Sequence, residues 1–184
     1  HGKIAFVARN RPADLAAFLG MLALGCRIRM VYPFQSPQAI AREIEGIQPS
    51  VLLAAAEDYS DPVFAVLQEA GAAAIALGPM SAASPDGFER SLKVAQDDGS
   101  GPQVEILTSG TTGPPKSFAL SYDMIARYIA GAATVQSRQN DNGVAPCPPL
   151  LYFPVSNISG LHSVLPPLLK GQSMVLLERF TVAG

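Results

Sequence analysis

Apolar residues along this chain follow two patterns that alternate, and together they predict strands and helices in turn. Four stretches predict strands, at residues 4–8, 27–32, 51–55 and 72–77. The stretches at 4–8 and 51–55 are apolar throughout, which is typical of strands covered on both faces of a sheet. Between the strands, apolar residues recur every three or four positions, which indicates helices with one buried face.

The predicted helices have recognisable ends. Pro12 and Pro37 suit the first position of a helix, and Ser36 can cap the second helix through its hydroxyl. A third helix opens at residues 61–62, and Gly25 and Gly71 suit the ends of the first and third. The expected buried stripes are Leu15, Phe18, Leu19 and Leu22; Ile40, Ile44 and Ile47; and Val63, Val66, Leu67 and Ala70.

This alternation predicts right-handed crossovers and an α/β fold, a mostly parallel sheet with helices on both faces. Residues 78–101 interrupt the pattern with Gly, Pro, Ser and Asp, and we expect a surface connector there with one short helix at 88–94. Farther on, Ser121 is expected to cap a long helix. An edge strand is expected near 151–153 and a last strand at 173–177. The apolar face of the long helix is predicted to be Met124, Ile125, Tyr128, Ile129, Ala132 and Val135.

The most informative stretch is VEILTSGTTGPPKSFALS, residues 104–121, which predicts a strand, a loop and a second strand. The loop glycines accept positive φ, so successive backbone N–H groups can point at one anion. Hydroxyls and the single ammonium of Lys116 would complete a polyphosphate site, whereas the alternative is an ordinary hairpin loop with a solvated lysine. The Walker spacing GxxxxGK[ST] fails, because two prolines separate Gly113 from Lys116.

The segment TSGTTGPPK resembles the signature of the adenylate-forming superfamily, which includes acyl-CoA synthetases, aryl-CoA ligases, luciferases and peptide-synthetase adenylation domains. Leu107 stands where the family commonly has an aromatic residue, and Ser117 where it has glycine. The resemblance implies activation of a carboxylic acid by ATP and Mg²⁺ as an acyl adenylate, release of pyrophosphate, and transfer to the thiol of coenzyme A. It assigns ATP binding to Thr108, Ser109, Gly110, Thr111, Thr112, Gly113 and Lys116.

A second segment, PVSNISGL at residues 154–161, is similar to the family's PxxHxxGL segment, which borders the acyl site. Asn157 stands where the histidine is common. The resemblance makes Asn157 and Gly160 substrate-binding candidates, while the position of Asn157 equally suits a helix cap. The helix that follows is expected to end at Lys170–Gly171 and to kink or restart at Pro166 and Pro167. His162 is expected to be structural, because no serine or cysteine is spaced to use it as a base.

Composition excludes several other functions for the 184 residues. The chain is 48% hydrophobic and 15% charged with a net charge of −2, so it has neither a basic stripe for nucleic acid nor a basic amphipathic helix for a membrane surface. No apolar run is long enough to span a bilayer. Cys26 and Cys147 lie far apart without a CxxC pair, so we expect reduced thiols, no zinc site and a cytoplasmic protein.

The resemblance also sets the expected extent of the enzyme. We expect residues 1–184 to be an incomplete N-terminal AMP-binding domain, without the C-terminal domain that carries the family's adenylation lysine. This part would then contain no catalytic residue and would be inactive alone, and no metal ligand is assigned to it. A noncatalytic nucleotide-binding or scaffold module and a fragment of a peptide-synthetase adenylation domain are the alternatives. The acid, the thiol acceptor and the oligomeric state are left open.

Overall fold

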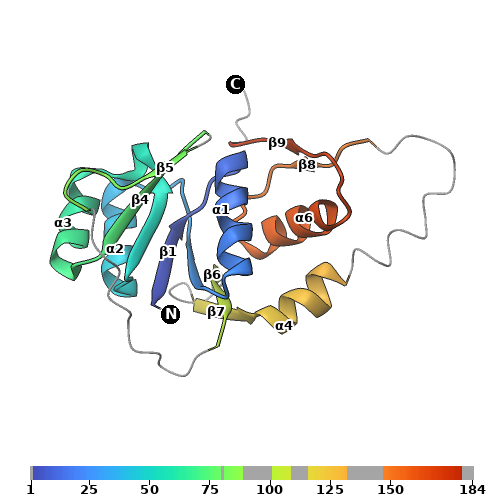
Figure 1. The fold of residues 1–184 in the computed structure, drawn as a ribbon, viewed down its shortest axis with the longest axis horizontal. Helices are drawn as coiled ribbons and strands as arrows, with labels where there is room; N and C mark the ends of the chain where they lie inside the picture. Colours follow the sequence, from blue (N-terminus) through green and yellow to red (C-terminus); the bar gives the residue numbers. More distant parts are fainter. Residues whose placement is uncertain (1, 80, 89–100, 109–115, 132–146, 180–184) are drawn as a thin grey trace, which may run out of the picture.

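The computed structural model describes residues 2–79, 81–88, 101–108, 116–131 and 147–179. Its main feature is a seven-stranded sheet with the order β5-β4-β3-β1-β2-β6-β7 (Figure 1). The five inner strands are parallel, and the two edge strands, β5 and β7, are antiparallel to their neighbours. The strands are β1 (Lys3–Val7), β2 (Arg27–Val31), β3 (Val51–Ala55), β4 (Ala73–Gly78), β5 (Ser81–Ala83), β6 (Gln103–Thr108) and β7 (Lys116–Ser121). The α/β prediction is confirmed.

The three crossover helices begin and end where the sequence predicts. They are α1 (Pro12–Ala23), α2 (Pro37–Ile47) and α3 (Asp61–Ala70). The Ser36 hydroxyl accepts a hydrogen bond from the Ala39 N–H at 3.3 Å, so it caps α2 as expected. Gly71 closes α3 with a φ of +63°, a left-handed conformation that glycine adopts without a steric penalty.

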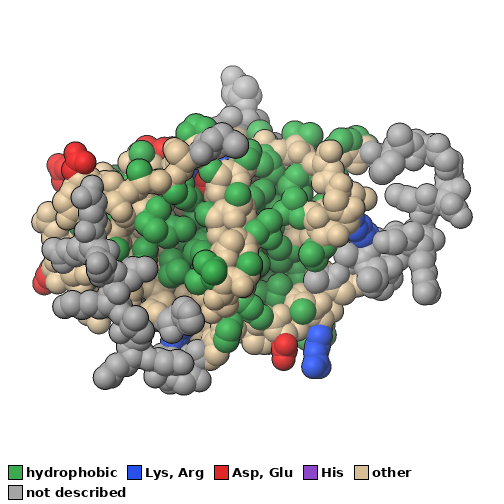
Figure 2. All heavy atoms as spheres, viewed as in Figure 1, with side chains coloured by type: hydrophobic (Ala, Val, Ile, Leu, Met, Phe, Trp, Pro, Cys, Tyr) green, Lys and Arg blue, Asp and Glu red, His purple; other side chains and the backbone are tan. Residues whose placement is uncertain are grey.

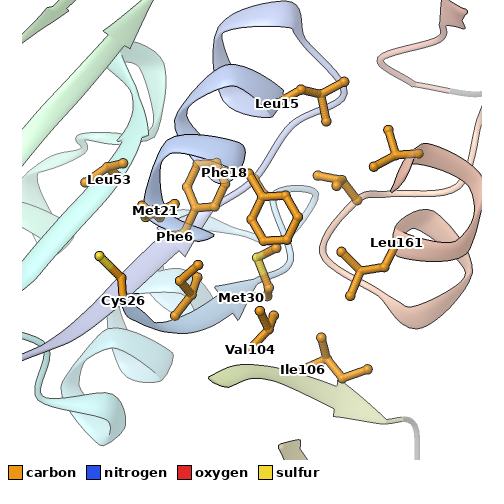
Figure 3. Close-up of a cluster of buried hydrophobic side chains, with 14 of the residues drawn as sticks. Phe6, Leu15, Phe18, Met21, Cys26, Met30, Leu53, Val104, Ile106 and Leu161 are labelled. Carbon is orange, nitrogen blue, oxygen red and sulfur yellow. The ribbon is translucent and has the colours of Figure 1, made fainter. Parts of the chain in front are cut away.

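Side chains of the central strand β1 alternate between two buried clusters, one on each face of the sheet. Phe6 belongs to the cluster beneath α1, together with Phe18, Met30 and Leu161 (Figure 3). Val7 belongs to the cluster on the side of α2 and α3, whose members include Ile44, Leu52, Val63 and Leu67. Apolar side chains gather at the surface on both sides of α1 in the view of Figure 2.

The C-terminal part of the chain packs against the α1 side of the sheet. It contains a small two-stranded parallel sheet of β8 (Leu150–Leu151) and β9 (Val175–Leu176), and the helix α6 (Ile158–Leu169). A short helix α4 (Tyr122–Met124), capped by the Ser121 hydroxyl, continues as the π-helix η2 (Ile125–Ala130).

Some sequence expectations need correction. No restart interrupts α6, although Pro166 and Pro167 lie inside it; they fall in its last turns, and the N–H of Lys170 still reaches their carbonyls. Tyr128 was expected on a buried face but is 69% exposed, because the π-helix shifts the helical period. Leu19 and Ala70, expected in buried stripes, are exposed. Residues 78–101, the expected surface connector, contain the exposed three-residue edge strand β5. The short helix expected at 88–94 lies outside the described residues except for Phe88, which is buried.

The strand order creates a crevice at one edge of the sheet. The crossover after β1 leads to β2 on one side, and the crossover after β3 leads to β4 on the other. Since β1 and β3 are neighbours, the connections that leave their carboxyl ends run in opposite directions, and such a switch point is the usual ligand-binding position in open α/β sheets.

Candidate functional site

The hairpin of β6 and β7 brings the two ends of the expected phosphate loop together. Thr108 and Lys116 are register partners, and the Thr108 hydroxyl donates to the Lys116 carbonyl at 3.1 Å. Because β6 runs parallel to β2, this mouth lies at the same carboxyl edge as the ends of β1 and β3. The strand–loop–strand prediction is therefore confirmed for the strands. Ser109, Gly110, Thr111, Thr112 and Gly113 lie outside the described residues.

Lys116 is exposed, and within the described ranges its ammonium makes no ion pair. The Thr108 hydroxyl proton is already donated to a carbonyl, so this side chain braces the mouth of the hairpin. Of the two predicted phosphate ligands that the structure describes, only Lys116 therefore presents a donor that is not engaged.

The second predicted segment forms the start of α6. The Asn157 side-chain oxygen accepts a hydrogen bond from the Gly160 N–H at 2.8 Å, so Asn157 caps the helix. Gly160 is buried, and a Cβ on it would lie 2.0 Å from the Pro154 carbonyl oxygen. Gly160 thus permits a close approach of two backbones. His162 is exposed, which agrees with its exclusion from the site.

Asn10, at the end of β1, is a site residue that the sequence analysis missed. It is 4% exposed, and its amide nitrogen donates to the carbonyls of Phe153 and Leu177, both at 3.0 Å. Its amide oxygen accepts from the Val155 N–H at 3.0 Å. One side chain therefore joins the crevice to the ends of β8 and β9. The only signal in the sequence is an asparagine two residues after the apolar stretch 4–8.

Arginines and carboxylates form an ion-pair network in the same crevice. Arg9 holds Asp58, in the turn after β3, through two hydrogen bonds of 2.6 and 3.0 Å, and its third nitrogen lies 3.3 Å from Glu178. Arg11 donates to Glu178 at 2.6 Å and also pairs with Glu57. The hydrogen bonds from Arg11 lower the pKa of Glu57 and Glu178.

The network borders an open cavity of about 450 Å³. Phe34 lies on its wall, with the guanidinium carbons of Arg9 and Arg179 at 5.8 and 5.7 Å from the ring centroid. Asp14, in the first turn of α1, accepts the Arg9 backbone N–H at 2.9 Å. Asp14 is 1% exposed, and burial raises its pKa to about 6.

Other kinds of site find little support in the described parts of the chain. Over these ranges no group of three or more His, Cys, Asp or Glu residues could hold a metal ion. Cys26 and Cys147 are free thiols, as expected, the first buried and the second exposed. Among the helices that the structure describes, none is both long and apolar enough to cross a membrane.

The sequence of the chain matches the model of one protein family. The model of the AMP-binding enzyme family matches residues 1–183. The chain belongs to the AMP-binding enzyme family. This confirms the resemblance of the sequence to adenylate-forming enzymes. No curated protein matches the sequence.

Solved structures of AMP-binding enzymes share the fold at low sequence identity. Apo MatB from Rhodopseudomonas palustris is 21% identical with a TM-score of 0.68, over 97% of this chain and 35% of MatB. MenE, an O-succinylbenzoate coenzyme A synthetase from Bacillus subtilis in complex with AMP, is 18% identical with a TM-score of 0.58, over 97% and 44%. The luciferase-like enzyme of the mealworm Zophobas morio is 17% identical with a TM-score of 0.64, over 95% and 41%. The chain thus spans about a third of the length of MatB.

Proposed function

We propose that this chain is the N-terminal part of an ATP-dependent acyl-CoA synthetase. The parent enzyme would activate a carboxylic acid as an acyl adenylate, release pyrophosphate, and pass the acyl group to coenzyme A. The observation that carries the proposal is the hairpin mouth, where Lys116 faces Thr108 across the two strands at the carboxyl edge of the sheet. Related structures add support: one structure of MatB has ATP bound, and one of a malonyl-CoA ligase has methylmalonyl-CoA and AMP bound.

The chemistry requires a positive charge where the diphosphate leaves. A carboxylate oxygen is a poor leaving group, whereas AMP is a good one, so adenylation prepares the acid for attack by a thiol. During adenylation, negative charge grows on the departing β- and γ-phosphates, and the ammonium of Lys116 would stabilise it. Mg²⁺, when bound, would share this charge; the described residues supply no cluster of ligands for it.

The start of α6 is proposed to border the acyl group. Because the Asn157 oxygen is engaged by the Gly160 N–H, its amide nitrogen is the group left to donate to a substrate. Gly160 would act indirectly, by letting the turn at Pro154 pack against the helix.

We also propose that residues 1–184 form part of a larger N-terminal domain, with residues 78–101 as a surface connector, and that they do not turn over substrate alone. Supporting this, the chain spans 35% of the length of MatB, whose fold it shares.

Equilibrium binding of ATP with Mg²⁺ tests the proposal. Lys116→Ala should weaken binding about 10- to 150-fold, the range for one charge-assisted contact. Lys170→Ala, at the end of α6, is the matched control and should leave the affinity unchanged. Equal affinities for wild type and Lys116→Ala would place the nucleotide elsewhere, and ATP–pyrophosphate exchange catalysed by the 184-residue chain would refute the expected inactivity.

A further inference from the structure

A second cavity, of about 380 Å³, lies on the α2 side of the sheet, away from the crevice. Its polar lining consists of Lys3, Arg29, Arg42, Glu43, Glu105 and Ser117. Ser117 follows Lys116 directly in β7, so the two side chains project from opposite faces of the hairpin. The cavity is therefore not the place to which Lys116 points, and its volume is in the range of small-molecule sites.

Arg29 offers this cavity an incompletely used guanidinium. The residue is 9% exposed, and one terminal nitrogen donates to Glu105 at 3.4 Å and to the Ser117 hydroxyl. Its Nε is buried and has no hydrogen-bond partner in the described part of the chain. A buried N–H without an acceptor is unfavourable, so an anion that accepts from this nitrogen would remove that penalty.

Glu43 lines the same cavity and has a carboxylate oxygen that lacks a hydrogen-bond donor within the described ranges. One carboxylate oxygen accepts from the Gln35 side chain at 2.9 Å, and the other is buried without a partner among the described residues. A ligand that satisfies the cavity must therefore accept at Arg29 and donate at Glu43.

Charge decides the class of ligand. The lining carries three cations against two carboxylates, and one of these, Glu105, is also paired with Arg27 at 3.0 Å. The remaining positive charge favours an anion. Ser117, which stands where the family commonly has glycine, adds a hydroxyl whose proton is available because its oxygen already accepts from Arg29.

We propose that this cavity binds hydrogen phosphate. Its unprotonated oxygens accept from Arg29 and Ser117, and its remaining P–OH donates to Glu43. Sulfate has similar size and charge but carries no proton near neutral pH. It would therefore leave the Glu43 oxygen unpaired and oppose it with a second negative charge.

Nuclear magnetic resonance titration of the ¹⁵N-labelled chain at pH 7.5 and constant ionic strength tests this, with sodium phosphate in one series and sodium sulfate in the other. Phosphate should shift amide signals near residues 29, 43 and 117, and sulfate should bind about tenfold more weakly. The proposal would be overturned if phosphate shifted only amide signals around Lys116, or if the two anions bound with equal affinity.

Variants sharpen the result. Ser117→Gly should weaken phosphate binding about three- to tenfold, and Arg29→Lys, which loses the forked donor, about tenfold or more. Glu43→Gln supplies an N–H donor in place of the carboxylate, so it should raise sulfate affinity to that of phosphate. Lys116→Ala should leave the phosphate affinity measured from the signals of residues 29 and 43 unchanged, which separates this site from the proposed nucleotide site. If Arg29→Lys does not fold, Ser117→Gly and Glu43→Gln still decide: unchanged anion affinities in both overturn the proposal.

Discussion

Replacing Asn10 by alanine should destabilise the fold more than the loss of a small polar side chain normally does. The substitution removes three hydrogen bonds at once, those to Phe153, Val155 and Leu177. Asn10 is 4% exposed and Val155 is fully buried, so the Val155 N–H would lose its acceptor, Asn10 Oδ1, in a place that water reaches poorly.

The magnitude follows from how well each freed group can be rehydrated. The Val155 N–H stays buried and should cost the full penalty of an unsatisfied donor. The Phe153 carbonyl belongs to a residue that is 37% exposed, so water can replace part of that bond. We expect a loss of about 2–4 kcal/mol in the free energy of unfolding. For a chain of this length, this corresponds to a melting temperature lower by about 4–16 °C.

The assay is urea unfolding followed by circular dichroism, with Asn157→Ala as the matched control. Asn157 makes one side-chain hydrogen bond to a helix N–H, so its loss should cost about 1 kcal/mol. Asn10→Asp gives a second comparison. It keeps the acceptor for Val155 but turns a carboxylate toward two carbonyl oxygens, so at neutral pH it should be no more stable than Asn10→Ala.

Hydrogen exchange shows where the destabilisation acts. In Asn10→Ala the amides of residues 155 and 177 should exchange faster, while those of β3 and β4 keep the protection set by global unfolding. If Asn10→Ala unfolds within 0.5 kcal/mol of Asn157→Ala, the three bonds do not hold the small sheet in place and the reasoning is wrong.

Two further predictions concern Gly160 and Asp14. Gly160→Ala should lower the free energy of unfolding by about 1–3 kcal/mol, because its Cβ would meet the Pro154 carbonyl at 2.0 Å. Gly20→Ala is the control: no atom lies within 4 Å of the added Cβ, so the change should be neutral or stabilising. Equal melting temperatures of the two variants would contradict this prediction. For Asp14, burial raises the pKa from 3.8 to about 6, so the folded state binds more protons than the unfolded state between these values. The contribution of Asp14 to stability is therefore present below pH 4 and decreases by about 3 kcal/mol as pH rises through 6, and Asp14→Asn should remove this dependence in urea unfolding at pH 4 and 7.

The parts of the fold that the sequence predicts well depend on local patterns. The strand ranges and the starts of α1, α2 and α3 follow from apolar periodicity, from Pro12 and Pro37, and from the Ser36 cap, because each acts within a few residues. The hairpin of β6 and β7 was predictable for the same reason. The prediction that Tyr128 is buried was wrong, because a π-helix changes the helical period from which the apolar face was predicted.

The candidate site could be predicted only in part, since most of its contacts join distant segments. Thr108 and Lys116 are eight residues apart and share one hairpin. Arg9 and Glu178, in contrast, are separated by 169 positions, and nothing in the sequence pairs them. Asn157 shows a further limit: both a capping and a pocket role were open, and the structure shows the cap while the pocket role stays a proposal.

The end of β1 explains how a sheet edge and a distant segment become one site. β1 is already paired with β2 on one edge and with β3 on the other, so its backbone does not pair with the C-terminal segment. Side chains do so instead: Arg9 reaches Asp58 and Glu178, and Asn10 reaches Val155. Val155 lies two residues before Asn157, the cap of α6. The start of α6 is therefore joined to the end of the central strand through one buried side-chain amide.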